Sequence, residues 1–196
     1  MSSANIAVFA SHGGSDLQAI IDGCKSGAIN ARVSVVISNN SDSFALTRAK
    51  NENIPAFHIS KKTAPDSLDE KILEILQLHK TDIIFLAGYL KKIPLVVLQI
   101  FENRIFNIHP SLLPKFGGKG MFGINVHKAV LDAGETETGI TIHRVTADYD
   151  QGEILAQKIV PVLPQDTPEI LAARVLEKEH ILIVEFLGEL MRKWKF

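Results

Sequence analysis

The chain has 196 residues, of which 46 % are hydrophobic and 22 % charged, and its formal net charge at pH 7 is -1. This length predicts one domain, and the charge argues against a nucleic-acid-binding protein, which normally carries a basic excess. The single cysteine, Cys24, excludes an internal disulfide and a cysteine-rich zinc site. No positively charged signal segment and no apolar run of about 20 residues occurs, so we expect a cytoplasmic protein with no membrane partner.

Strand-like and helix-like segments alternate through the first half of the chain. The apolar or β-branched runs that predict strands are 5–10, 32–38, 55–59, 82–87 and 104–108. Helical spacing of apolar residues predicts helices over 17–24, 43–51, 68–76 and 94–101. This order is typical of parallel strands joined by right-handed crossovers. It predicts a doubly wound α/β sheet, mostly parallel, with helices on both faces.

The second half begins with a long irregular stretch, 107–123, which holds two prolines and four glycines. Loops of this length are often functional. A helix is predicted over 126–133, with Gly134 suited to its C-terminal cap. Strands are predicted over 138–145 and 153–162, either as a hairpin or as the edge of a mixed sheet, which brings the sheet to seven strands. Pro168 after Asp166-Thr167 predicts the start of a last helix that runs to about Trp194.

The loop after the first strand, 11–16 (SHGGSD), is the first candidate site. Backbone N–H groups at a helix N-terminus bind anions, and glycines let the backbone approach a phosphate closely. The alternative is a glycine-rich turn in which Ser15 or Asp16 caps the helix. On this segment alone the two interpretations are about level.

Asn107 and His109 form the second candidate site, at the end of the fifth predicted strand. Residues i and i+2 of a strand face the same side, and ligands of open α/β sheets bind beyond the carboxyl ends of the strands. Asparagine supplies a neutral donor for a developing oxyanion, and histidine supplies a group that transfers protons near neutral pH. The alternative is a polar strand end that the loop backbone satisfies.

Asp150 is the third candidate, in the turn 148–152 (DYDQG). A carboxylate beside an imidazole raises the pKa of the imidazole, so Asp150 would keep His109 protonated if the two lie close together. Alone, such an Asp-x-Gly segment is usually only a turn. His12, His127 and His143 receive less weight, and no spacing of metal ligands appears in the sequence.

The stretch 107–114 (NIHPSLLP) resembles the motif of folate-dependent formyltransferases. The resemblance covers nearly the whole chain, and it is closest to the members that formylate glycinamide ribonucleotide (GAR) in purine synthesis. It implies a Rossmann-like formyltransferase fold in a single domain, 1–196. A phosphate-binding half, 1–105, would be followed by a folate-binding and catalytic half, 106–196. The implied reaction is attack of the GAR amine on the formyl carbon of 10-formyltetrahydrofolate, with no metal and no covalent intermediate.

The resemblance also implies roles for individual residues. Asn107 would stabilise the oxyanion, His109 would donate a proton, and Asp150 would assist His109. The residues implied to bind GAR are Gly13, Gly14, Ser15, Asp16, Ile108, Pro110 and Glu179. The residues implied to bind folate are Leu90, Lys91, Lys92, Ile93, Asn107 and Val145. The chain departs from the usual pattern at Asp16, where the family commonly has Asn, and at Lys91, where an arginine is common.

Two other functions compatible with the same residues stay open. One is a non-catalytic sensor of phosphoribosyl compounds or nucleotides, which would not require Asn107, His109 and Asp150 together. The other is a formyltransferase for a different amine, such as a sugar nucleotide. In each case we expect small-molecule substrates or ligands, and a monomer or a homodimer.

Overall fold

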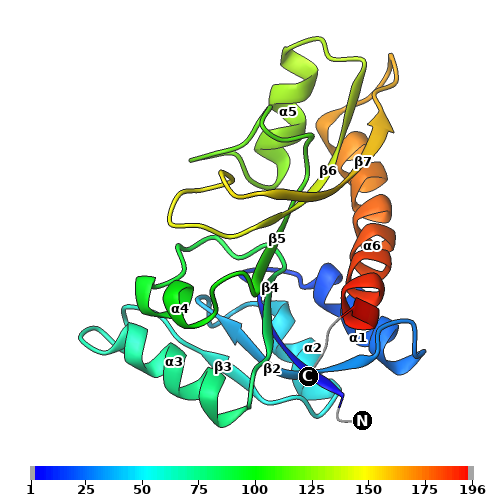
Figure 1. Ribbon diagram of the computed structural model, residues 1–196. Coiled ribbons are helices and arrows are strands. Elements are labelled where there is room, and N and C mark those ends of the chain that lie inside the picture. Colours follow the sequence, from blue (N-terminus) through cyan, green and yellow to red (C-terminus); the bar gives the residue numbers. More distant parts are fainter. Residues whose placement is uncertain (1–2, 194–196) are drawn as a thin grey trace.

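The computed structural model describes residues 3–193, within which seven strands form one sheet flanked by six helices (Figure 1). The strands are β1 (Ala4–Phe9), β2 (Ala31–Ser38), β3 (Ala56–His58), β4 (Ile83–Leu86), β5 (Ile105–His109), β6 (Glu137–Arg144) and β7 (Ile154–Pro161). The helices are α1 (Ser15–Lys25), α2 (Phe44–Asn51), α3 (Leu68–Leu78), α4 (Leu95–Ile100), α5 (Ile124–Asp132) and α6 (Pro168–Lys193). The predicted class, a mostly parallel α/β sheet of seven strands, is confirmed.

The strand order is β3-β2-β1-β4-β5-β6-β7. Strands β1 to β5 are parallel, and β6 and β7 are antiparallel to their neighbours. The chain moves outward from β1 to β3, then returns to the other side of β1 to form β4. This reversal opens a crevice beyond the carboxyl ends of β1 and β4, where ligands of such sheets bind.

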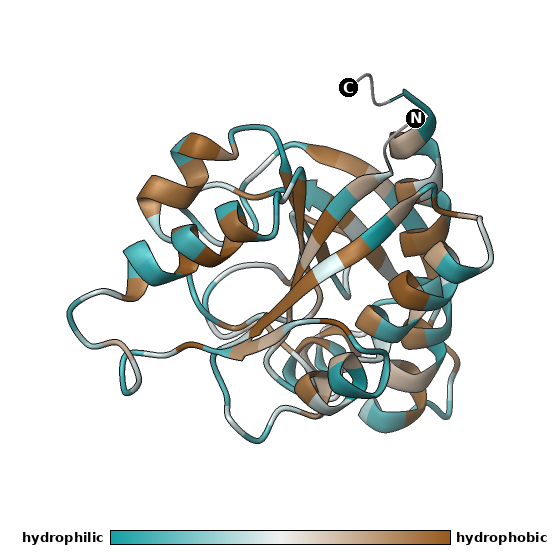
Figure 2. Ribbon diagram, turned by 90° about the horizontal axis from the view of Figure 1, so that it is seen from below, coloured by the Kyte–Doolittle hydropathy of each residue, from teal (hydrophilic) through white to brown (hydrophobic). Residues whose placement is uncertain are grey.

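Alternating side chains divide the core into two layers. In β1, Ile6 and Val8 pack into the cluster that also contains residues of α1, α2, α5 and α6. Ala7 and Phe9 pack on the opposite face, with residues of α3 and α4. Figure 2 shows apolar strands between helices that turn hydrophilic residues outward. The larger cluster joins residues on both sides of position 105, from Ala4 to Met191; the single domain stays a prediction.

The predicted helix boundaries have visible local causes. Gly134 follows Ala133, the C-cap residue of α5; it has φ of 67°, and its N–H donates to the carbonyl of Leu131 at 3.0 Å. Pro168 is the first residue of α6, and the hydroxyl oxygen of Thr167 accepts from the N–H of Ile170 at 3.3 Å. Trp194, which we expected near the end of this helix, lies outside the described residues.

The loop between β5 and α5 folds back over β6. The Thr141 hydroxyl donates to the carbonyl of Ser111 at 2.7 Å and accepts from the N–H of Leu113 at 3.0 Å. The Leu113–Pro114 peptide bond is cis. These bonds hold the loop beside β5 and so help to shape the site. Among the described helices, none has the length and apolar character that a membrane crossing requires.

Candidate active site

A single pocket of about 830 Å³ gathers the residues that the sequence assigned to the site. It lies at the carboxyl ends of β1, β4 and β5, where the reversal of the strand order predicts a crevice. The lining includes every one of them: Gly13, Gly14, Ser15, Asp16, Leu90, Lys91, Lys92, Ile93, Asn107, Ile108, His109, Pro110, Val145, Asp150 and Glu179. Segments far apart in the sequence therefore meet in one cavity.

The loop after β1 leaves the N-terminus of α1 without a side-chain cap. Gly14 is the N-cap residue, with φ of 68°, and no side chain accepts from the first turn of the helix. A Cβ atom at Gly14 would lie 2.7 Å from Cβ of Ala45 and 2.9 Å from its Cα, so the close approach of α2 requires glycine here. The alternative in which Ser15 or Asp16 caps the helix is therefore wrong. The uncapped N–H groups favour an anion at this end of the pocket.

Helix α2 fixes the position of this loop through several polar contacts. The Ser43 hydroxyl donates to the carbonyl of His12 at 2.8 Å, and Arg48 Nε donates to the carbonyl of Gly13 at 2.8 Å. Ser11, the first residue of the candidate loop 11–16, accepts at its hydroxyl from the N–H of Leu90 at 2.9 Å. That last bond joins the loop after β1 to the segment after β4, and both segments line the pocket.

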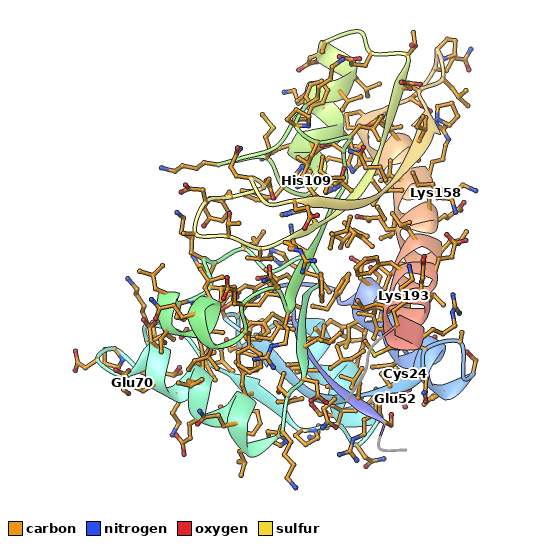
Figure 3. The ribbon with its side chains drawn as sticks, viewed as in Figure 1. Cys24, Glu52, Glu70, His109, Lys158 and Lys193 are labelled. Carbon is orange, nitrogen blue, oxygen red and sulfur yellow. The ribbon has the colours of Figure 1, made fainter. Side chains whose placement is uncertain are left out.

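Asn107 and His109 project from the end of β5 into the same cluster, as the i, i+2 spacing predicts. Nδ2 of Asn107 lies 3.0 Å from Nε2 of His143 on the adjacent strand β6. Nε2 of His109 lies 2.8 Å from the carbonyl oxygen of Phe116. Since a carbonyl only accepts, this ring nitrogen carries a proton and donates it. His109 is buried, and in Figure 3 its label stands among the crowded side chains of the upper part of the molecule, whereas Glu70 lies at the left edge.

The Asp150 carboxylate lies between two imidazoles. Its Oδ2 atom is 3.6 Å from Nδ1 of His109, and its Oδ1 atom is 3.4 Å from Nε2 of His143. The N–H of Gly118 donates to Oδ2 at 2.8 Å. Asp150 is therefore held from the loop after β5 as well as from its own loop after β6. The three candidate catalytic residues, with His143, form one cluster.

Burial dominates the protonation of His109. It lowers the pKa of His109 below its ordinary value of 6.5, and the raising effects of Asp150 and of the Phe116 carbonyl offset only part of this. Asp150 therefore acts in the direction that we expected, but burial outweighs it, because the imidazole is 4 % exposed and a buried cation loses hydration. When the ring is neutral, the contact with the Phe116 carbonyl keeps its proton on Nε2, and Nδ1 faces Asp150.

Asp150 itself is ionised. Burial raises its pKa, but the contact with His143, the positive charge that His109 carries when it is protonated and the N–H of Gly118 together outweigh that effect and lower the pKa below its ordinary value. An ionised carboxylate beside a neutral imidazole stabilises the imidazolium whenever His109 gains a proton. The pair is suited to receive a proton and to release it again.

The other end of the pocket is more apolar. Ile93 is buried, and Leu90 and Val145 line the cavity near it. Lys92 lies at the rim, where Nζ is 3.5 Å from Asp148 and 5.3 Å from the centre of the Tyr149 ring. This part can accept a flat apolar group, with cationic side chains at its edge.

Two histidines matter more than the sequence indicated. His143 touches both Asn107 and Asp150, and the cross-strand register of β5 and β6 was the signal that would have found it. His127 is 4 % exposed and lines the pocket, and its Nδ1 has no hydrogen-bond partner among the described residues. Burial and the nearby His109 lower the pKa of His127 to about 4, so this ring is neutral.

Neither a reactive thiol nor a metal-ligand cluster is found among the described residues. Burial raises the pKa of the Cys24 thiol to about 11, and Cys24 is not part of the pocket lining. Among residues 3–193, no group of three or more His, Cys, Asp or Glu side chains is arranged to hold a metal ion. The contacts of Asn107, His109 and Asp150 themselves suit acid–base and oxyanion chemistry.

Comparison with known proteins gives a uniform result. The sequence model of the family described as "Formyl transferase" matches residues 4–187 of this chain. The chloroplastic phosphoribosylglycinamide formyltransferase of Arabidopsis thaliana is 45 % identical over 196 residues, covering 97 % of this chain and 67 % of that protein. The phosphoribosylglycinamide formyltransferase of Haemophilus influenzae is 41 % identical over 177 residues, covering 89 % of this chain and 81 % of that protein.

The solved structures agree with these relatives. Glycinamide ribonucleotide transformylase 1 from Symbiobacterium toebii superposes with a TM-score of 0.89 at 39 % identity. The match covers 96 % of this chain and 88 % of that one. The chain thus spans about two thirds of the plant relative and most of each bacterial one.

Proposed function

Because this chain belongs to the formyl transferase family and formylates glycinamide ribonucleotide in purine biosynthesis, we propose that Asn107, His109 and Asp150 carry out the reaction with 10-formyltetrahydrofolate as donor. The observation that carries this proposal is the cluster in which Asp150 touches His109, and Asn107 projects from the same strand. The consistent names of the relatives favour this function over a sensor and over an enzyme for another amine.

The reaction begins when the GAR amine attacks the formyl carbon. A C–N bond forms, and the formyl oxygen becomes an oxyanion that the Asn107 amide stabilises through an N–H donor. The neutral His109 accepts the proton that the amine loses, and Asp150 stabilises the resulting imidazolium. His109 then donates this proton to N10 of the folate as the bond from the formyl carbon to N10 breaks. The products are N-formyl-GAR and tetrahydrofolate.

The two ends of the pocket suit the two substrates. The uncapped N-terminus of α1, with Gly13, Gly14, Ser15 and Asp16, binds the GAR phosphate. Glu179 on α6 lies in the same part of the lining and accepts from the ribose hydroxyls, while Ile108 and Pro110 line the passage to the catalytic cluster. Leu90, Ile93 and Val145 pack against the flat pterin ring, and Lys91 and Lys92 provide charge for the carboxylates of the folate.

An absorbance assay for loss of the formyl group from 10-formyltetrahydrofolate tests the proposal. The reaction is run with GAR, with water alone and with a sugar-nucleotide amine. We expect deformylation that depends on GAR. Deformylation without any amine would indicate a hydrolase, and turnover only with the sugar nucleotide would reassign the acceptor. The expected cytoplasmic location, and the choice between monomer and homodimer, stay predictions; sedimentation of the purified chain decides the second.

A further inference from the structure

Two carboxyl groups from separate helices meet at the α1 end of the pocket. Asp16 is in the first turn of α1, and Glu179 is on α6, which packs beside α1 (Figure 1). Both residues line the pocket. The Asp16 side chain is 13 % exposed and Glu179 is 8 % exposed. Two acidic side chains are therefore buried together at the place where a phosphate is proposed to bind.

No cation of the described part of the chain neutralises this pair. Oδ1 of Asp16 is buried and has no hydrogen-bond partner, and the nearest basic atom is Nε2 of His180, 3.5 Å away. Burial and the charge of Arg48 lower the pKa of His180, so that ring is neutral at pH 7. Arg48 instead donates to the carbonyl of Gly13 and to Oε1 of Gln18. Glu179 forms no salt bridge within residues 3–193.

The pKa values of both carboxyl groups are raised. Burial raises the pKa of Asp16 to about 6. Burial and the neighbouring Asp16 raise the pKa of Glu179 well above its ordinary value. Two coupled carboxyl groups titrate as a pair, in two separate steps. Near neutral pH the pair therefore carries one proton rather than none.

We propose that Asp16 and Glu179 share one proton in the free enzyme and take up a second when a phosphate-bearing substrate binds at the N-terminus of α1. This inference rests on the proposed function, which places the GAR phosphate on the loop 13–16. A phosphate brings further negative charge next to Asp16, and like charges disfavour each other's ionised form. Protonated Asp16 has the shape of asparagine and becomes a neutral O–H donor. It thereby supplies in a pH-dependent way what the common family residue, Asn, supplies at every pH.

Isothermal titration calorimetry with GAR alone, without folate, measures this proton directly. Titrations at pH 7 in two buffers of different ionisation enthalpy give the number of protons taken up on binding. Asp16→Asn is the matched control, because the substrate's own phosphate, whose second pKa is about 6, contributes equally to both proteins. We expect the wild type to take up more protons than Asp16→Asn, and Glu179→Gln to reduce the uptake as well.

The affinity for GAR gives a second readout. From pH 6 to pH 8 the wild-type affinity should fall more steeply than that of Asp16→Asn, by up to about tenfold per pH unit. At pH 8 the Asn variant should bind GAR more tightly than the wild type. A merely structural role for Asp16 would weaken binding in the variant at every pH.

The outcomes separate this inference from the proposed function. Equal proton uptake by the wild type and Asp16→Asn, together with a changed affinity for GAR in either variant, would overturn the shared proton and leave the GAR site in place. If neither substitution alters the affinity or the proton uptake, the placement of GAR beside Asp16 and Glu179 is itself wrong. Both substitutions conserve shape, and a thermal melt checks that each variant is folded.

Discussion

Nδ2 of Asn107 lies 3.0 Å from Nε2 of His143, and this contact fixes the direction of the Asn107 amide. An amide nitrogen only donates, so Nε2 of His143 accepts. Nδ1 of the same ring donates to the carbonyl of Arg144 at 2.7 Å. Nε2 is also 3.4 Å from Oδ1 of Asp150, and this contact becomes a hydrogen bond only when Nε2 carries a proton. One hydrogen of the Asn107 amide is thus held by His143, and the other is free for an oxyanion.

Loss of this support should reduce turnover without abolishing it. In His143→Ala, Asn107 keeps its donor but loses the partner that orients it, so we expect kcat to fall about 10-fold to 100-fold. This is less than the loss that removing an oxyanion donor outright typically causes. Steady-state kinetics with GAR and 10-formyltetrahydrofolate, beside a thermal melt, measure the effect. A His143→Ala enzyme with the wild-type kcat would show that Asn107 needs no such support.

The protonation of His109 can be measured by NMR titration of its ring nitrogens. Since burial lowers the pKa of His109, we expect a value below 6.5. Asp150→Asn removes the negative charge that favours the imidazolium, so the pKa should fall further in that variant. His109→Asn assigns the resonance. A wild-type value above 6.5 would contradict the neutral ring on which the proposed proton transfer depends.

Substitutions at the adjacent glycines Gly13 and Gly14 test whether the loop before α1 is shaped for a phosphate or is an ordinary turn. A Cβ atom at Gly14 would collide with the backbone of Ala45 at positive φ, whereas a Cβ atom at Gly13 would meet nothing within 4 Å. Gly14→Ala should therefore lower the free energy of unfolding by about 1–3 kcal/mol and raise the KM for GAR at least tenfold. Gly13→Ala should keep the wild-type melting temperature. Equal melting temperatures for both variants would show that the loop tolerates the left-handed position without glycine.

Acid should destabilise the protein partly through His127. Its pKa of about 4 lies below the ordinary 6.5, so the unfolded chain binds the proton more readily between these values. The contribution to stability is complete above pH 6.5 and is lost as the pH falls through about 4. It amounts to about 3 kcal/mol. His127→Asn should therefore lose less stability than the wild type between pH 7 and pH 4.5 in urea unfolding. An equal loss of stability in both proteins would show that groups other than His127 cause the acid sensitivity.

Local patterns predicted most of the fold. The apolar run of β1 and the helical spacing of apolar residues in α1 or α3 are properties of neighbouring residues, so the sequence alone reveals them. The sequence left open whether the last two strands form a hairpin or the edge of a mixed sheet. The structure shows both, because β6 and β7 are antiparallel partners and β7 is the outer strand. The partner of β6 on its other side, β5, is not visible from local sequence.

The candidate site was predictable in the same measure. Asn107 and His109 are two residues apart on one strand, so their common direction followed from strand geometry. Asp150 is 41 residues further along than His109, and only the resemblance to known formyltransferases indicated that they meet. The lowered pKa of His109 and the burial of His127 depend on packing by the loop 110–123 and by α5. No single-sequence pattern describes that packing.

The kcat of Asn107→Ala and of His109→Ala, measured in the GAR-dependent formyl transfer assay, tests the central claim most directly. The claim assigns the oxyanion donor to Asn107 and the proton carrier to His109. We therefore predict that each variant melts like the wild type and loses about 10²–10³-fold or more in kcat. Turnover near the wild-type rate in either folded variant would contradict the role assigned to that residue.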